Sequence, residues 1–203
     1  MKALHRADLF GWSRFDESRN IDFNSLLWLR PEGNVVIDPL PLSEHESARL
    51  ERFGGVRHIV ITNSDHVRAA LELRERTGAR TYGPRGEQNQ FPIACDTWLA
   101  DGDSVVEGLV VLALDGSKTP GELALTLAGT TLITGDLVRA HAAGRLDLLP
   151  DAKLVDAARA RQALRRLCEL PEIEAVLPGD GWPVFRDGQR ALVELLGRVD
   201  SPR

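Results

Sequence analysis

Short apolar runs alternate with longer segments of helical periodicity, and this alternation most constrains what the chain can fold into. The short runs predict strands at residues 26–29, 35–37, 58–62, 110–114, 123–127, 131–134 and 175–177. The longer segments predict helices at residues 43–53, 64–76, 151–170 and 188–199, with Ser64 able to cap the second. Because the strands come first and the helices later, the pattern favours sheets with helices outside over a doubly wound sheet.

Chain length and net charge narrow the possible domain organisation and the possible partners. The chain has 203 residues, 43% of them hydrophobic, which predicts one well-buried domain spanning residues 1–203. Its formal net charge is −5, and phosphate binding needs clustered Lys and Arg, so nucleic acid is not expected as a partner.

The sequence also bears on location. No apolar run approaches the length needed to cross a bilayer, and residues 1–10 lack the apolar core of a signal peptide. The two cysteines, Cys95 and Cys168, lie far apart in apolar surroundings, which argues against a disulfide framework. We therefore expect a cytoplasmic protein that has no contact with membranes.

Polar residues follow three of the predicted strands. They read T-N-S-D-H at 62–66, T-G-D at 134–136 and P-G-D-G at 178–181, and a fourth polar turn, D-G-S-K-T-P-G, occupies residues 115–121. Strands that end together deliver their loops to one edge of a sheet, where ligand sites usually form. An aspartate after a strand is commonly only a turn former, so the order of the four segments is what carries the argument.

That order resembles the metallo-β-lactamase superfamily. Its members carry T-H-x-H-x-D-H after an apolar strand, then a turn like P-G-H-T-P-G, a strand ending T-G-D and a late strand ending P-G-H-G. The resemblance covers residues 26–180 and includes the early strand V-V-I-D-P at 35–39. It implies an α/β (α+β) fold, a four-layer αββα sandwich in which two mixed sheets face each other with helices outside. An unrelated three-layer α/β fold with coinciding loops is the alternative.

The first motif can be aligned in two ways. Counting back from the helix places Asp65 and His66 over the family's D-H pair and removes the H-x-H. Counting from Thr62 places Asn63 and Asp65 over the two histidines and Arg68 over the last one. We favour the first alignment, because it puts no charged Arg68 in a metal pocket.

The resemblance then implies a degenerate metal site. The family holds one metal with H-x-H and a third histidine, and a second with the D-H pair and a last histidine, while an aspartate bridges the two. Here Lys118 stands at the third histidine, so the first site is lost, because a protonated lysine cannot ligate. The candidate ligands of the second site are Asp65, His66, Asp136 and Asp180.

One divalent metal, Zn, Mn or Fe, would bring this acidic cluster near neutrality, and an oxygen-rich set also suits Mg. The opposing interpretation is a metal-free ion-pair network in which Lys118 pairs with Asp136.

Two functions follow. The first is a hydrolase of ester, thioester or lactone substrates that uses one residual metal, with Lys118 and Asp65 as candidate catalytic residues. The second is an inactive, metal-free descendant that binds a small ligand or a protein partner in the same cleft. Either would act on a small molecule or partner, with a homodimer as the default assembly.

Overall fold

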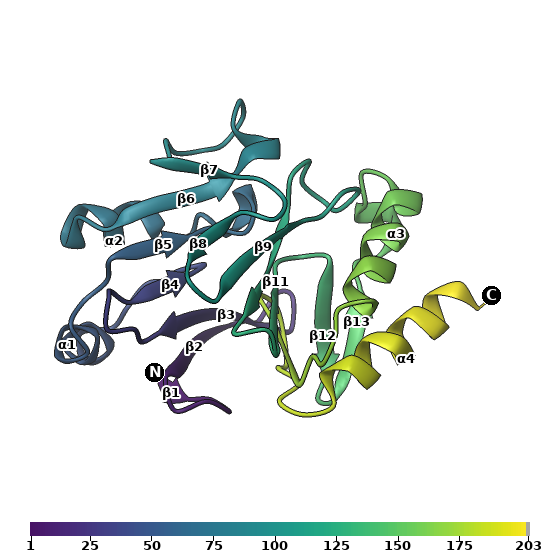
Figure 1. Ribbon diagram of the computed structural model, residues 1–203, viewed down its shortest axis with the longest axis horizontal. Helices are drawn as coiled ribbons and strands as arrows, with labels where there is room; N and C mark the ends of the chain where they lie inside the picture. Colours follow the sequence, from purple (N-terminus) through teal and green to yellow (C-terminus); the bar gives the residue numbers. More distant parts are fainter. Residues whose placement is uncertain (202–203) are drawn as a thin grey trace.

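The computed structural model describes residues 1–201 and contains two β-sheets packed face to face, with two helices on each outer side (Figure 1). This is the four-layer αββα sandwich that the resemblance implied. No helix within residues 1–201 is both long and apolar enough to cross a lipid bilayer. Cys95 and Cys168 are both free, as expected from their spacing.

The first sheet has seven strands in chain order. They are β1 (Lys2–Ala3), β2 (Leu9–Asp16), β3 (Ile21–Trp28), β4 (Val35–Ile37), β5 (His58–Val60), β6 (Arg80–Pro84) and β7 (Thr97–Leu99). Strands β1 to β4 pair antiparallel and β4 to β7 pair parallel. The change of direction at β4 brings the carboxyl ends of β4 and β5 to the same edge.

The second sheet has the order β14-β11-β10-β9-β8. Its strands are β8 (Ser104–Val106), β9 (Leu109–Ala113), β10 (Leu123–Leu127), β11 (Thr131–Thr134) and β14 (Ala175–Pro178), and β12 (Val138–Ala142) with β13 (Arg145–Leu148) form a separate hairpin. Only β11 and β14 pair parallel. Their carboxyl ends therefore meet, as those of β4 and β5 do.

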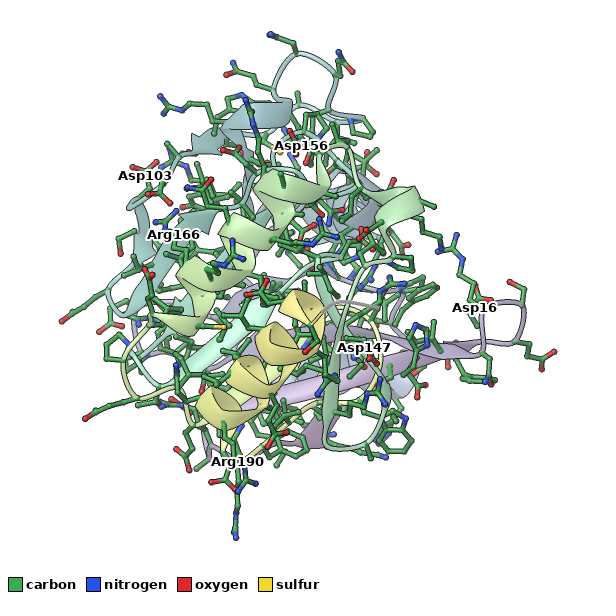
Figure 2. All side chains as sticks on the ribbon, turned by 90° about the vertical axis from the view of Figure 1, so that its right-hand side faces the viewer. Asp16, Asp103, Asp147, Asp156, Arg166 and Arg190 are labelled. Carbon is green, nitrogen blue, oxygen red and sulfur yellow. The ribbon has the colours of Figure 1, made fainter. Side chains whose placement is uncertain are left out.

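Three apolar clusters fill the spaces between the four layers. The central cluster joins Leu26 and Val60 of the first sheet to Leu125 and Ile133 of the second. On the outer face of the first sheet, a second cluster includes Leu50 of α1 (Glu44–Arg52) and Leu73 of α2 (Ala70–Thr77). A third lies between the second sheet and the helices α3 (Ala157–Cys168) and α4 (Gly188–Asp200). Figure 2 looks onto these last two helices, with Arg166 labelled on the side of α3.

The helix starts follow their local sequence. Ser43 and Glu46 form a reciprocal capping box at α1, in which each side chain bonds the other's backbone N–H. Asp156 caps α3 by accepting from the N–H groups of Ala158 and Arg159. The helix predicted from residue 151 therefore begins at Ala157, after a separate 3-10 turn.

The helix predicted from residue 64 is also divided. Residues Ser64–His66 form a 3-10 turn capped by Asn63, not by Ser64, and α2 begins only at Ala70. Between them Arg68 has a φ of 45°, a left-handed conformation that no continuing helix allows. This break turns the Arg68 side chain toward the edge where the strands end.

Candidate metal centre

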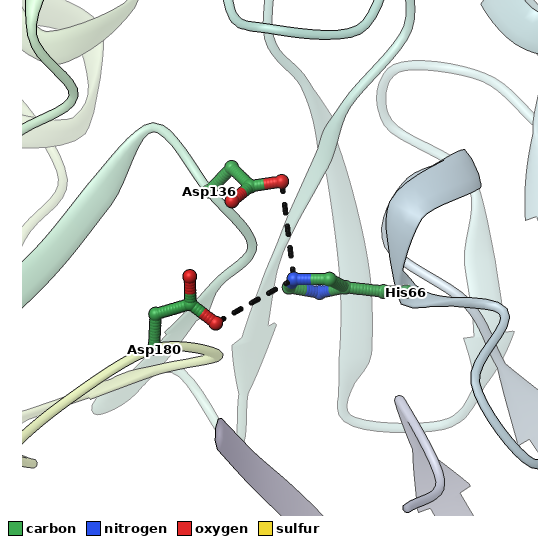
Figure 3. Close-up of side chains that lie close together, drawn as sticks. All are labelled: His66, Asp136 and Asp180. Atoms are coloured by element: carbon green, nitrogen blue, oxygen red, sulfur yellow. Dashed lines mark ion pairs between the residues drawn. The ribbon is translucent and has the colours of Figure 1, made fainter. Parts of the chain in front are cut away.

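Three buried side chains from separate loops meet where the strands end (Figure 3). His66 follows β5, Asp136 follows β11 and Asp180 follows β14. One ligand atom from each lies within 4.8 Å of the others, and among residues 1–201 this is the one group that satisfies that geometry. His66 Nε2 is 3.9 Å from Asp136 Oδ2 and 3.8 Å from Asp180 Oδ1. Three of the four predicted ligands are thus brought together.

Asp38 holds the other side of the His66 ring. It directly follows β4, and its Oδ2 lies 2.8 Å from His66 Nδ1. Thr62 donates to the same carboxylate from its backbone N–H at 2.8 Å and from its hydroxyl at 2.7 Å. The imidazole also packs on the Gly179 backbone, where a Cβ would lie 2.6 Å from its Cε1. The ring is therefore fixed with Nε2 toward the two aspartates.

Two arginines neutralise the aspartates. Arg139, on β12, contacts Asp136 Oδ1 at 3.2 Å through Nη2 and pairs more closely with Asp180 through the same nitrogen. Arg68 Nη2 lies 3.4 Å from Asp180 Oδ1. Both side chains are at most 10% exposed. Two carboxylates thus face two guanidinium groups.

The ionisation of the cluster follows its surroundings. Burial alone would lower the pKa of His66, but the charge and hydrogen bond of Asp38 together with the charge of Asp136 outweigh it, and the net pKa is raised. Burial raises the pKa of Asp180, and the positive charge of His66 only partly opposes this. Burial alone would raise the pKa of Asp38, yet the charge and hydrogen bond of His66, the charge of Arg68 and the Thr62 hydrogen bond together leave it below its ordinary value. Asp38 and His66 therefore each favour the charged form of the other.

The remaining predicted residues lie elsewhere. Asp65, predicted as a ligand, is outside the group of three and forms an ion pair with Lys118. Their side chains are 44% and 36% exposed, so the pair faces solvent. The predicted pairing of Lys118 with Asp136 is wrong: Arg139 takes that place. The two candidate catalytic residues, Asp65 and Lys118, therefore neutralise each other at the surface and lie outside the buried cluster.

Several observed contacts are also consistent with the alternative alignment. Counting from Thr62 places Asn63, Asp65 and Lys118 at the three histidines of the first metal. Asn63 Nδ2 donates to Asp136 Oδ2 at 3.2 Å, while Asp65 pairs with Lys118. Arg68 falls on the last histidine of the first motif and contacts Asp180. Arg68, which the favoured alignment kept out of the metal pocket, is therefore part of the buried charged cluster.

Two buried glutamates escaped the sequence reasoning. Glu122 accepts from the Ser117 hydroxyl and from Leu137 N–H, which fixes the backbone beside Asp136. Glu87 accepts from Ser64 N–H and from the Thr119 hydroxyl, and so ties the loops of Asp65 and Lys118 together. Glu122 directly follows the T-P-G turn, but nothing in the sequence marks Glu87.

A sequence model of the family described as the metallo-beta-lactamase superfamily matches residues 1–199. The chain belongs to the metallo-β-lactamase superfamily. Several solved structures share this fold at low sequence identity. A metallo-β-lactamase from Pontibacter korlensis is 18% identical with a TM-score of 0.71, covering 95% of this chain and 96% of that one. The metallo-β-lactamase FIM-1 from Pseudomonas aeruginosa, in its mono-zinc form, is 16% identical with a TM-score of 0.71, covering 96% and 92%.

Two similar relatives carry the name hydroxyacylglutathione hydrolase. The protein from Fuscovulum blasticum is 35% identical over 153 residues, 70% of this chain and 57% of its own length. The protein from Cereibacter sphaeroides is 37% identical over 118 residues, 55% of this chain and 46% of its own length. The chain spans about half the length of these curated relatives. The comparison therefore supports a relationship to hydrolases only at the level of the superfamily.

The metal of this superfamily does not fit the side chains as they are arranged. Asp136 and Asp180 already accept hydrogen bonds from the guanidinium groups of Arg139 and Arg68. The Asp38–His66 contact itself is compatible with a metal, because a metal-ligating histidine commonly donates its other ring N–H to a carboxylate. Two guanidinium charges balance the two carboxylates, so a divalent ion would leave the buried site with uncompensated positive charge. The ligand atoms are close enough for a metal, but their electrostatic surroundings exclude one while both arginines remain.

Proposed function

We propose that this chain is a metal-independent member of the metallo-β-lactamase superfamily that binds a small organic molecule and has no metal-dependent hydrolase activity. The observation that carries the proposal is the pairing of Asp136 and Asp180 with Arg139 and Arg68. In a metallohydrolase of this superfamily, the carboxylate at the position of Asp136 would help to hold the ion that activates water. Here the negative charges of Asp136 and Asp180 are balanced by arginine side chains of the same chain.

Burial supports the same conclusion. The side chains of His66, Asp136 and Asp180 are at most 5% exposed. A catalytic metal site keeps one coordination position open to water and substrate. A cluster this enclosed offers a reacting carbonyl no direct approach.

A cavity next to this cluster provides room for the ligand. It measures about 660 Å³, within the range of small-molecule sites, and Pro178 and Gly181 on either side of Asp180 form part of its wall. Trp12, Leu26 and Leu177 are other apolar lining residues. We therefore expect a ligand whose body is apolar, such as an acyl or aromatic group.

Metal content and thermal stability test the metal-independent part. Protein purified without chelator should contain less than about 0.1 equivalent of Zn, Mn or Fe, and its melting temperature should be the same with and without EDTA. A bound metal at 100 times its dissociation constant would contribute about 2.7 kcal/mol, or roughly 5–10 °C in a domain of this size. A stoichiometric metal whose removal lowers the melting temperature by that amount would refute the proposal.

Dye binding tests the cavity. Trp182 lines it and is 53% exposed, whereas Phe15 is 58% exposed and is not among the lining residues. Titration with anilinonaphthalene sulfonate should give a dissociation constant at least fivefold larger for Trp182→Ala than for the wild type. The dissociation constant of Phe15→Ala should equal that of the wild type. Equal affinity in all three proteins would show that the dye does not use this cavity.

A thioester hydrolase is the second candidate. Two observations favour it: the kinship with hydroxyacylglutathione hydrolases and the three ligand atoms within 4.8 Å. It predicts turnover of a hydroxyacylglutathione thioester that needs added Zn, Mn or Fe and is abolished by Asp136→Asn. The metal-independent proposal predicts no turnover above that of the Asp136→Asn protein, so one assay separates the two candidates.

A further inference from the structure

Arg139 contacts the aspartates in an unusual way for an arginine. A single nitrogen, Nη2, reaches both Asp136 and Asp180, while Nε is buried without a hydrogen-bond partner among the described residues. An arginine that recognises a carboxylate commonly donates two parallel hydrogen bonds from its planar fork. Here the fork is unused, and the side chain supplies one positive centre shared by two carboxylates from different loops. A bridging metal ion would make the same kind of contact.

The charges show what would follow if this centre were removed. Without Arg139, Arg68 alone would remain beside Asp136 and Asp180, and one buried carboxylate charge would have no partner. Buried unpaired charges are strongly destabilising, so such a site takes up a cation or a proton. The His66 ring would still be held by Asp38 and Gly179 with Nε2 facing both aspartates. Three ligand atoms would thus remain in place with a charge that attracts a cation.

We propose that Arg139 is an internal substitute for the metal, and that replacing it with a neutral residue uncovers a site for one divalent cation at His66 Nε2, Asp136 and Asp180. The inference rests on the proposed metal-independent function and adds that a single side chain enforces it. The uncovered site takes a cation that accepts one imidazole and two carboxylates, such as Zn²⁺, Co²⁺ or Mn²⁺. Arg68 is not sufficient to exclude the ion, because it contacts only Asp180, at 3.4 Å.

The experiment compares metal binding by the wild type and by Arg139→Ala. Calorimetric titration with Zn²⁺ or Co²⁺ should give about one equivalent for the variant and less than about 0.1 for the wild type. The ion should also raise the melting temperature of the variant by roughly 5–10 °C at about 100 times its dissociation constant. Arg139→Gln repeats the test with a side chain that leaves less empty space, in case the alanine protein does not fold without metal.

Three controls locate the effect. Arg139→Lys keeps the positive charge and should bind no metal. Arg145→Ala removes an arginine that is 60% exposed on β13, and it should also behave as the wild type. The double variant Arg139→Ala with His66→Ala should bind at least tenfold more weakly than Arg139→Ala alone, because it lacks the imidazole.

The outcomes separate this inference from the proposed function. If folded Arg139→Ala and Arg139→Gln take up no metal, the latent site does not exist, while the metal-free wild type still supports the proposed function. If the wild type binds one equivalent at the same three residues, both are refuted. If Arg139→Lys binds as well as Arg139→Ala, charge is not what excludes the ion and the inference is wrong.

Discussion

At the scale of single residues, Asp38 organises the candidate site without being one of its ligands. It is 2% exposed, and its carboxylate accepts from Thr62 N–H and hydroxyl while pairing with His66. Its own carbonyl accepts from the Ser25 hydroxyl. The residue therefore connects β3, β4 and the loop after β5 around one negative charge. The orientation of the His66 ring depends on it.

Asp38→Asn should therefore destabilise the protein by about 2–4 kcal/mol, because it removes the counter-charge of His66 and places an amide opposite the Thr62 hydroxyl. Urea unfolding followed by circular dichroism measures this loss. Asp101→Asn is the control, since it breaks a surface pair with Arg166 and should cost no more than about 1 kcal/mol. Equal losses in the two variants would contradict the central position of Asp38.

Glu122 makes stability depend on pH in a predictable direction. Burial, reinforced by the charge of Asp136, raises the pKa of Glu122 to about 7 from an ordinary 4.5. The folded state then binds the proton more tightly than the unfolded state, so stability from this group is fully present below pH 4.5 and is lost as the pH rises to 7. The loss is on the order of 3 kcal/mol.

Glu122→Gln cannot ionise, so its stability relative to the wild type should improve by roughly 2–3 kcal/mol between pH 5 and pH 8. Urea midpoints of both proteins, measured at each pH, give the difference directly. Parallel pH profiles would mean that Glu122 keeps an ordinary pKa.

The sequence predicted some residues of the candidate site and missed others. His66, Asp136 and Asp180 follow strands whose apolar runs are easily recognised, so their convergence was predictable. Arg139 lies three residues beyond Asp136, on a strand whose last two residues are exposed. Nothing in its sequence spacing distinguishes it from a surface arginine. Arg68 was rejected for its charge, because the positive φ that turns it inward cannot be read from the residue type.

At the scale of elements, the strands β4, β5, β9, β10, β11 and β14 were predicted to within two residues from apolar runs alone, whereas β3 was predicted only over its buried end. Most of the missed strands are half exposed or very short, such as β2, whose outer half alternates between exposed and partly buried residues. Strand β6 was also missed, although four of its five residues are buried. The hairpin of β12 and β13 was missed as well, although it carries Arg139 against Asp180. Its alternation is weakened by a register shift between Arg139 and Ala142.

Gly181 joins that hairpin to the loop of Asp180. Its φ is 95°, and a Cβ there would collide with the carbonyl oxygen of Ala140 on β12. Gly181→Ala should therefore lower stability by about 3 kcal/mol or more, because backbone cannot yield as a flexible side chain does. Gly197→Ala, in the open on α4, should instead stabilise by about 0.5–1 kcal/mol. Thermal melts of the two variants should shift in opposite directions.

At the scale of the whole molecule, the strand order within each sheet could not be derived from periodicity. Apolar runs show which segments are buried, but a pairing such as β11 with β14 joins segments about forty residues apart, with the β12–β13 hairpin and α3 between them. The family resemblance supplied that topology. Contacts between the sheets then tie both to the site, as where Leu123 N–H donates to Thr62 O at 2.8 Å.

The central cluster predicts how the molecule unfolds. Leu125 of β10 is fully buried between the two sheets, so Leu125→Ala should cost about 2–5 kcal/mol. Because both sheets share this cluster, residues 1–203 should unfold as one unit, and tryptophan fluorescence and far-ultraviolet circular dichroism should give the same urea midpoint in the wild type and in the variant. Val193→Ala, on the exposed side of α4, should change stability by no more than about 0.5 kcal/mol. Separate midpoints for the two probes would mean that the sheets belong to two independently folding units, and the loops that bring His66 to Asp136 and Asp180 would then be held together less rigidly than the ion pairs require.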